Sequence, residues 1–103
     1  MYERGKKARG VHMVVFALPT ERDQVRLGIT ATRRIGGAVV RNRARRRIRE
    51  LFRLHRTAWE PWTLDTVVNC RIGCSVVPWA ELERDFLRCV EILKHRLGRH
   101  ERQ

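Results

Sequence analysis

The stretch VVRNRARRRIRELFR, residues 39–53, combines a high density of positive charge with a regular spacing of apolar residues. Seven of its fifteen residues are arginine, against a single glutamate. Val40, Ala44, Ile48, Leu51 and Phe52 recur at the spacing that places residues on one face of an α-helix. The stretch therefore predicts an amphipathic helix that packs its apolar stripe on a core and turns a basic face outward.

The predicted basic face is unfavourable for the helix taken by itself. It is made of Asn42, Arg45, Arg46, Arg49 and Arg53, with Arg41 and Arg43 on the flanks of the first turn. Like charges one turn apart repel each other, and cations near a helix N-terminus oppose the helix dipole. Gly37 is the predicted N-cap. These local costs indicate that the arginines serve a partner outside the helix.

The regions around this helix predict a small sheet and a second helix. Residues 11–18 and 25–33 have the pattern of two strands, joined by a turn at 19–24 into an antiparallel hairpin. Residues 66–72 predict a third strand, 78–97 a last helix, and 98–103 a frayed tail. The order strand, strand, basic helix, strand, helix predicts an α+β fold in which helices pack on a small central sheet, as one domain over residues 1–103.

The composition of the whole chain favours a polyanionic partner. The chain has 103 residues, 43% of them hydrophobic, which suffices for one modest core. Lysine and arginine number 23 and aspartate and glutamate 11, so the formal charge is +12. Such a charge favours phosphates, because binding them releases counterions. The sequence shows no membrane-spanning run and no signal-peptide pattern, so we expect a cytoplasmic protein with no membrane partner.

The cysteines and histidines do not have the spacing of a metal site or of a disulfide framework. Cys70, Cys74 and Cys89 are odd in number, with a single C-x3-C pair. The four histidines show no spacing typical of zinc ligands. We therefore expect three reduced, mostly buried thiols and no metal held by the protein alone.

A basic helix suits three kinds of anionic partner: a membrane surface, DNA or folded RNA. A membrane-surface helix would present its apolar stripe to lipid, whereas this stripe is needed for the core. A DNA-reading helix would follow a packed helix-turn-helix partner, and none precedes it in the sequence. Folded RNA fits best, because arginine offers planar, forked donors to phosphates and base edges. The residues by themselves therefore predict a structured polyanion, preferably RNA.

Residues 26–53, RLGITATRRIGGAVVRNRARRRIRELFR, closely resemble the protein subunit of bacterial ribonuclease P. That family carries an R-N-R-x-x-R-x-x-R-E pattern after a short G-x-A-V, which stands here as Arg41, Asn42, Arg43, Arg46, Arg49 and Glu50. Residues 65–90, DTVVNCRIGCSVVPWAELERDFLRCV, resemble the last strand and helix of the family. The resemblance covers residues 13 to 93, and its central motif is long and specific.

The resemblance implies a fold with a left-handed βαβ crossover around the basic helix, the opposite of the usual hand. It also implies that the protein binds the catalytic RNA of ribonuclease P and the 5′ leader of precursor tRNA. The RNA, with its bound Mg²⁺, performs the endonucleolytic hydrolysis, so the protein is an accessory subunit without catalytic residues or an obligatory protein partner. The alternative is a general RNA-binding or RNA-chaperone module with no link to tRNA processing.

Carried over residue by residue, the resemblance assigns two sets of site residues. The set facing the catalytic RNA is Arg33, Arg34, Arg41, Asn42, Arg43, Arg45, Arg46 and Arg49. Glu50 either orients a neighbouring arginine or is an ordinary surface residue. The weaker set, for the leader cleft, is His12, Val14, Phe16, Thr30 and Thr32. Phe16 either stacks on a base or lies in the core, which is the commoner place for an aromatic residue in a strand.

The first residues depart from the family pattern. Family members begin with a helix whose aromatic residue forms one wall of the leader cleft. Residues 1–7, MYERGKK, resemble only the end of that helix, with Tyr2 and Gly5 matching its closing residues. We therefore expect most of this helix to be missing here, with consequences for leader binding and stability.

Overall fold

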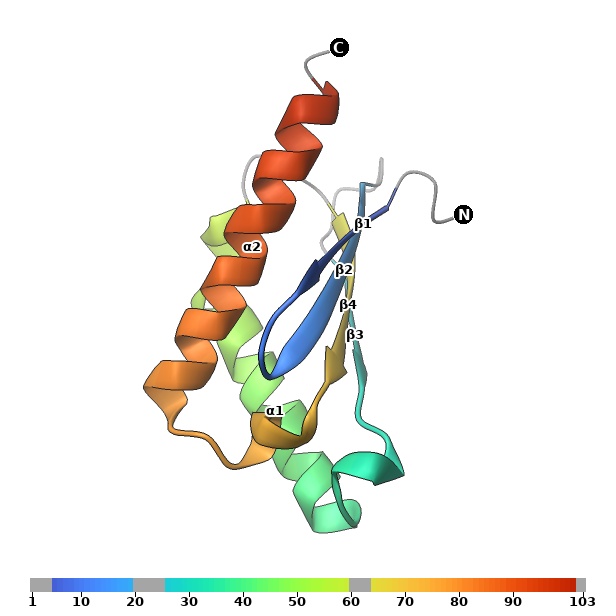
Figure 1. Ribbon diagram of the computed structural model, residues 1–103, viewed down its shortest axis with the longest axis vertical. Coiled ribbons are helices and arrows are strands. Elements are labelled where there is room, and N and C mark those ends of the chain that lie inside the picture. The colour runs from blue at the N-terminus through green and yellow to red at the C-terminus, as the bar shows by residue number, and fades with distance from the viewer. Residues whose placement is uncertain (1–4, 20–25, 60–63, 102–103) are drawn as a thin grey trace.

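Two long helices lie on the same face of a mixed β-sheet (Figure 1). The computed structural model describes residues 5–19, 26–59 and 64–101. Within these ranges the strands are β1 (Lys6–Arg9), β2 (Met13–Pro19), β3 (Arg26–Thr30) and β4 (Leu64–Cys70). The helices are α1 (Ala38–Leu54) and α2 (Trp79–Glu101), with short 3-10 helices η1 (Arg33–Ile35), η2 (Arg56–Trp59) and η3 (Ile72–Ser75). The α+β class predicted from the sequence is confirmed.

The order of the strands in the sheet is β1-β2-β4-β3. β2 pairs antiparallel with β1 and with β4, whereas β3 pairs parallel with β4. The predicted hairpin between residues 11–18 and 25–33 is therefore wrong, because β4 lies between β2 and β3. Strand β1 was not predicted at all, since its sequence KKAR has only one apolar residue. Lysines of this kind are common on edge strands, where they discourage pairing with other chains.

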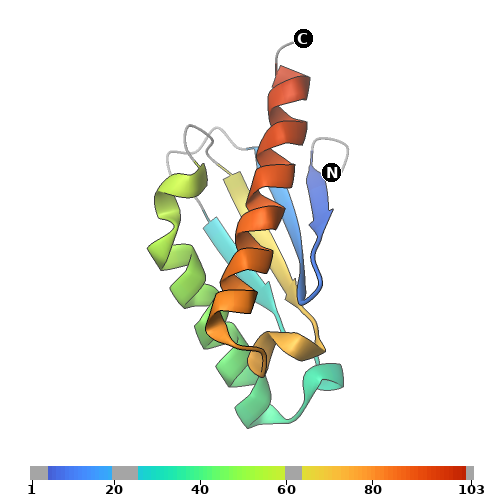
Figure 2. The same ribbon diagram turned by 60° about the vertical axis from the view of Figure 1, so that its left-hand side comes forward.

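The connection from β3 through α1 to β4 is a βαβ crossover. Figure 2 views the sheet from the side of the helices, with β3 and β4 both pointing downward. The chain leaves β3, passes through α1 in front of the sheet and enters β4 on the right of β3. This path is left-handed, as the family resemblance implies and against the usual preference.

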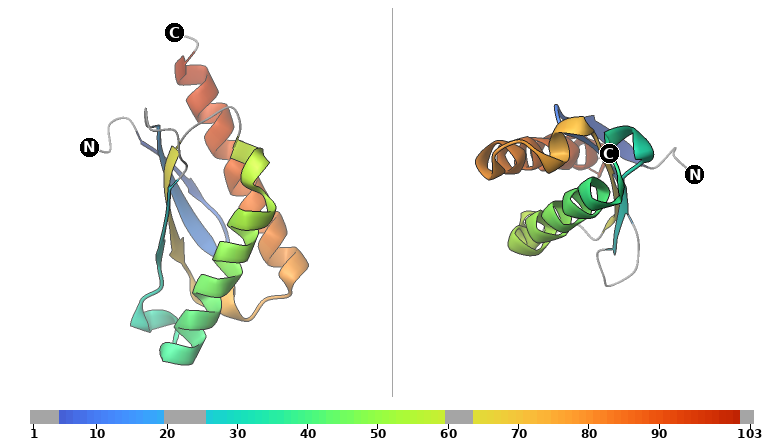
Figure 3. Two further views of the ribbon diagram at one scale, coloured as in Figure 1. Left: turned by 180° about the vertical axis from the view of Figure 1, so that it is seen from behind. Right: turned by 90° about the horizontal axis from the view of Figure 1, so that it is seen from below.

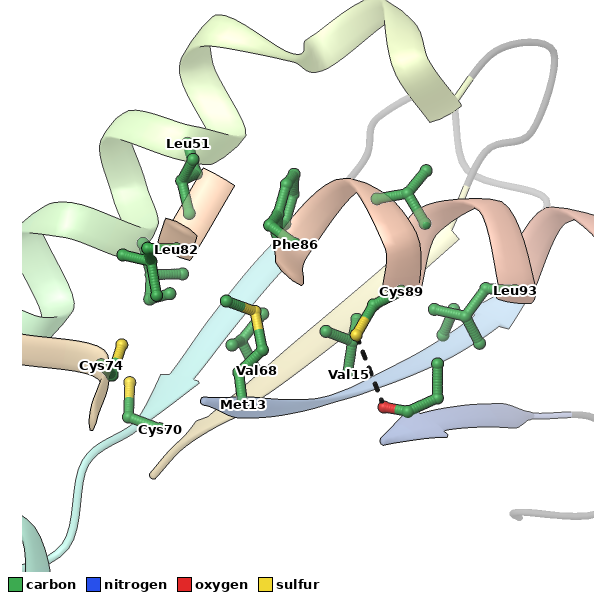
Figure 4. Packing of buried hydrophobic residues seen from close by; sticks show 14 of the residues in the cluster. Met13, Val15, Leu51, Val68, Cys70, Cys74, Leu82, Phe86, Cys89 and Leu93 are labelled. Atoms are coloured by element: carbon green, nitrogen blue, oxygen red, sulfur yellow. Dashed lines mark hydrogen bonds between the residues drawn. The ribbon is translucent and has the colours of Figure 1, made fainter. Parts of the chain in front are cut away.

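The core lies between the sheet and the two helices (Figure 4). Alternate residues of β2 and β4 face it, among them Met13 and Val15 on β2 and Val68 on β4. Phe86 and its neighbours from α2 cover them. The apolar stripe of α1 closes the other side through its buried residues Ala44, Ile48 and Leu51. The basic helix is thus held by its apolar stripe, as its sequence predicts.

Gly36 shapes the entry into α1. Its φ of 144° lies in a region that residues with a side chain rarely adopt. A Cβ at this position would lie 2.8 Å from Cβ of Val40, so a side chain would also collide with the first turn. Gly37 follows as the N-cap of α1, without a side chain to cap it. This tight turn sets α1 directly after η1.

Two predicted boundaries differ from the structure. Helix α2 continues to Glu101, whereas residues 98–103 were expected to form a frayed tail. Residues 1–4 of the predicted helix end lie outside the described residues. Lys6 and Lys7 belong to β1, so for them the prediction of a helix is wrong. Gly5, which was matched to the end of a helix, lies directly before strand β1.

Candidate nucleic-acid interface

The arginines predicted to face RNA gather on the outer side of α1 and on η1 just before it. Asn42, Arg43, Arg46 and Arg49 are exposed, and Arg41 and Arg45 are partly exposed. Arg33 and Arg34 are exposed on η1, which contacts the start of α1. The opposite side of α1 is in the core, so the helix cannot turn these side chains inward. We call the set of eight residues, Arg33, Arg34, Arg41, Asn42, Arg43, Arg45, Arg46 and Arg49, the basic face.

The basic face is not neutralised by acids of the described chain. Within the described residues, Arg43, Arg46 and Arg49 have no ion pair. Arg45 donates a hydrogen bond from Nη1 to Oδ1 of Asn42 at 3.2 Å, a neutral partner. The guanidinium groups of the basic face are therefore available to an anion.

Glu50 engages Arg53, which the sequence placed on the outer side of the helix but which is not among the eight residues of the basic face. Arg53 donates from Nε to Oε1 of Glu50 at 3.0 Å and from Nη2 to Oε2 at 2.5 Å. This hydrogen bonding lowers the pKa of Glu50 and raises the pKa of Arg53. Both groups lie on the surface, where such pairs contribute little to stability. Glu50 therefore bonds a neighbouring arginine and is also a surface residue, so the two alternatives do not exclude each other.

Arg47 lies among the arginines of α1 but makes hydrogen bonds to backbone groups elsewhere in the fold. Its Nη1 donates to the carbonyl of Cys74 at 2.9 Å and its Nη2 to the carbonyl of Val77 at 2.5 Å. Its guanidinium also lies 5.8 Å from the ring centroid of Trp79. Arg47 therefore ties α1 to η3 and to the start of α2. The sequence carries a signal for this role, because residue 47 borders the apolar stripe directly before Ile48.

A groove of about 670 Å³ runs along one flank of the basic face. Its α1 wall is polar and its other wall, from η3 to the start of α2, is mainly apolar. The lining residues are Arg43, Arg46, Arg47, Glu50, Ser75, Val76, Val77 and Trp79. Val76 is 71% exposed there. Guanidinium groups beside an apolar wall suit a nucleotide, which has both a phosphate and a flat base.

The second candidate surface is the sheet face away from the helices (Figure 3). Val14 and Thr30 flank Asn69 in one row of paired residues, and Phe16 and Gly28 flank Val67 in the next. We call these six residues the outer sheet face. No helix of the described chain covers it, and Val67 is 41% exposed.

Phe16 lies on the outer sheet face and not in the core, where an aromatic residue was the commoner expectation. The Nζ atom of Lys7 lies 5.8 Å from the centroid of its ring. Beside it is a hollow of about 570 Å³, lined by Gly5, Lys6, Lys7, Phe16, Ala17, Leu18, Asp65 and Val67. An aromatic ring with a lysine over it and a hollow next to it is suited to stacking of an unpaired base.

His12 and Thr32 do not share the outer sheet face. His12 is 8% exposed, and its Nε2 lies 2.7 Å from Oε2 of Glu81 on α2, so it belongs to the helix side. Its inclusion among the leader-cleft candidates is not supported by this position. Thr32 is exposed directly before η1, at the edge of the sheet. Val14, Phe16 and Thr30 are the candidates that the fold brings together.

The described ranges hold neither a cluster of metal ligands nor a helix that could span a membrane. No group of three or more histidine, cysteine, aspartate or glutamate side chains gathers there as a metal site would require. The carboxylates of Glu50 and Glu81 are instead engaged by Arg53 and His12. No described helix is both long enough and apolar enough to cross a membrane.

Comparison with known proteins identifies the family. The Ribonuclease P family model matches residues 1–94. The ribonuclease P protein component of Desulfovibrio desulfuricans is 36% identical over 103 residues, covering 96% of this chain and 75% of that protein. That of Syntrophus aciditrophicus is 34% identical, covering 84% and 71%.

Solved structures agree with the sequence relatives. The RNase P protein of Thermotoga maritima superposes with a TM-score of 0.75 at 30% identity, covering 91% of this chain and 86% of that one. The protein of Staphylococcus aureus gives 0.75 at 27% identity, covering 88% and 83%. The fold, the arginine motif on α1 and these relatives together place the chain in the bacterial ribonuclease P protein family, as the protein subunit of an endoribonuclease that matures the 5′ ends of tRNAs.

Proposed function

We propose that the basic face binds the catalytic RNA of ribonuclease P. The observation that carries this proposal is the arrangement of α1, which buries its apolar stripe and leaves Arg43, Arg46 and Arg49 without an acidic partner in the described chain. Uncompensated arginines on a rigid helix meet phosphates at low cost in conformational freedom, since the helix itself is already ordered. Release of counterions from the RNA supplies the driving force.

The outer sheet face is the proposed site for the 5′ leader of precursor tRNA. The support is its chemistry: Phe16 and Val67 form an apolar strip, and Lys7 and Arg9 on β1 are exposed at its edge. Single-stranded nucleic acid is commonly bound by such a combination of aromatic stacking and nearby cations. Thr30 and Asn69 add hydroxyl and amide groups at one end of the strip.

The hydrolysis itself is proposed to belong to the RNA subunit. Mg²⁺ prefers carboxylate and phosphate oxygens, and its ligands are assigned to the phosphates of the RNA. The protein then acts by binding precursor tRNA more tightly than product and by lowering the Mg²⁺ requirement. The expected setting is the bacterial cytoplasm, with the catalytic RNA and precursor tRNA as partners and no obligatory protein partner.

A pair of matched double variants tests the basic face. Arg45→Ala/Arg49→Ala removes from the basic face two cations that lie one helical turn apart. Arg84→Ala/Arg88→Ala removes from α2 two exposed cations with the same spacing. The first variant is expected to lower the slope of log affinity against log salt by about 1.4–1.8, if each arginine contacts one phosphate. The second is expected to leave the slope nearly unchanged. Equal effects of both variants would contradict the assignment of the interface to α1.

Cleavage of precursor tRNA at limiting Mg²⁺ tests the proposed role as a whole. The cognate catalytic RNA is assayed with and without the protein, and the protein is expected to stimulate it. Tight binding to that RNA without stimulation would favour the alternative, a general RNA-binding module.

Phe16→Ala tests the leader site: it is expected to weaken the preference for precursor over mature tRNA by about 1–3 kcal/mol for one lost stacking contact. Leu54→Ala, an exposed apolar residue on α1, serves as its control.

A further inference from the structure

Two cysteines lie next to each other where β4 ends and η3 begins. Cys70 is the last residue of β4, and Cys74 lies in η3. The backbone turns back between them, since the N–H of Cys74 donates to the carbonyl of Arg71 at 2.9 Å. Figure 4 shows the two side chains next to each other, with the sulfur of Cys70 directed toward Cys74. Both cysteines are free thiols in this structure.

The two thiols are chemically unequal. The hydrogen bond from the Cys74 thiol lowers the pKa of Cys70, and the positive charge of Arg45 lowers it further. The same hydrogen bond, together with burial, raises the pKa of Cys74. Cys70 is therefore the sulfur that ionises, while Cys74 keeps its proton and stabilises the thiolate. A thiolate beside a protonated partner thiol is the arrangement of an attacking and a resolving cysteine.

Access to the pair is also unequal. A cavity of about 440 Å³ opens beside Cys70, lined by Val11, Thr32, Arg34, Ile35, Cys70, Arg71, Ile72 and Gly73. Cys70 is 9% exposed, whereas Cys74 is 0% exposed. A small reagent can therefore approach Cys70 through the cavity, while Cys74 is fully buried. Burial does not hinder Cys74 in its role, because its target is the neighbouring sulfur.

Cys89 supplies an internal reference for an unreactive thiol. It is 0% exposed in the core, and its Sγ donates to the carbonyl of Ala8 at 4.0 Å. Burial raises its pKa to about 11. At neutral pH its thiolate population is about a hundredfold smaller than that of an ordinary thiol. The three cysteines of this chain thus differ in position, ionisation and access.

We propose that Cys70 and Cys74 form a redox-active dithiol that small hydroperoxides oxidise to an intramolecular disulfide. In the first step the Cys70 thiolate attacks a peroxide oxygen, the O–O bond breaks, and the alkoxide or hydroxide leaves and takes up a proton. Cys70 becomes a sulfenic acid. In the second step the Cys74 sulfur attacks the Cys70 sulfur, the S–O bond breaks, and water leaves with the proton of Cys74. The dithiol is oxidised by two electrons and the peroxide is reduced by two.

Peroxide treatment of the full reduced chain tests this proposal. The folded protein is exposed to hydrogen peroxide, remaining thiols are blocked with iodoacetamide, and peptides are mapped by mass spectrometry. The expected product links Cys70 to Cys74, leaves Cys89 alkylated and is reversed by dithiothreitol. Cys74→Ser is expected to stop the reaction at a Cys70 sulfenic acid that dimedone traps. Cys70→Ser is expected to yield neither the disulfide nor a trapped product at Cys74.

Relative rates give a second readout that needs no variant. Iodoacetamide is expected to alkylate Cys70 more than about tenfold faster than Cys89 in the folded chain. All three thiols are expected to react at similar rates in guanidinium chloride, which would assign the difference to the fold. Equal rates in the folded chain would overturn the proposal, and so would exclusively intermolecular disulfides. If a serine variant does not fold, which circular dichroism reports, the rate comparison in the unaltered chain decides.

Discussion

Replacing Asp85 by alanine removes the contact that joins α2 to the turn between β1 and β2. Asp85 is 3% exposed, and its two carboxylate oxygens accept the backbone N–H groups of Val11 at 2.9 Å and His12 at 2.8 Å. A hydrogen bond to a charged group contributes about 1.5–3 kcal/mol. The N–H of His12 is buried and loses its full partner, whereas that of Val11 is only part-buried and regains water. We therefore expect Asp85→Ala to lower the free energy of unfolding by about 3 kcal/mol.

Urea unfolding followed by circular dichroism measures this loss. The transition midpoint is expected to fall while the slope against urea stays unchanged, because the core surface exposed on unfolding is the same. For a domain of this size the melting temperature is expected to fall by about 12–24 °C. Glu91→Ala is the matched control, since it removes an exposed carboxylate from the same helix. Its expected effect is within about 0.5 kcal/mol. If both variants unfold at the same urea concentration, the carboxylate of Asp85 does not hold the turn and the reasoning is refuted.

Three further predictions concern the stability contributed by Arg47, Gly10 and Cys89. Arg47→Ala is expected to lower the free energy of unfolding by about 2 kcal/mol, because its two carbonyl contacts are lost, whereas Arg46→Ala changes it by less than about 0.5 kcal/mol in the same urea assay. Gly10→Ala is expected to cost about 1–3 kcal/mol, since a Cβ there would lie 2.5 Å from Oδ2 of Asp85; an unaltered midpoint would contradict this packing. The pKa of Cys89 rises from 9.0 to about 11 on folding, so its contribution is full below pH 9 and is lost as the pH rises through 11. The difference in free energy of unfolding between the parent and Cys89→Ala is therefore expected to shrink from pH 9 to pH 11, when both are unfolded in urea with a reductant. A difference that stays constant would contradict the raised pKa of Cys89.

Helix α1 and the direction of its arginines were predictable because they depend on local spacing. In a helix the angular position of each residue follows from its number, so burying Ala44, Ile48 and Leu51 fixes where the arginines point. Strand order was not predictable in this way. The alternation of residues in β3 shows which of its faces is buried. The same alternation would result whether β3 paired with β2 or with β4. The choice of β4 depends on the packing of α1, which is a tertiary property.

The errors within the site have equally local causes. His12 has the same parity as Val14 and Phe16, so strand alternation assigned it to their face. β2 begins only at Met13, and His12 lies in the preceding turn, where alternation no longer applies. Arg47 was overlooked because a charge in an arginine-rich run looks like its neighbours. Its place beside Ile48, at the border of the apolar stripe, was the signal available in the sequence, and the carbonyls of Cys74 and Val77 show its different role.

Arg47 recognises main-chain atoms, and this has a consequence for how the protein tolerates change. The carbonyls of Cys74 and Val77 are present whatever side chains stand at those positions. A substitution at Cys74 or Val77 therefore leaves the two hydrogen bonds from Arg47 in place. The Cys74→Ser variant accordingly keeps this contact between α1 and the loop. A change in loop length is different, since one inserted or deleted residue displaces both carbonyls at once. The sensitivity of the basic face to mutation thus lies more in the length of the loop from η3 to the start of α2 than in its composition.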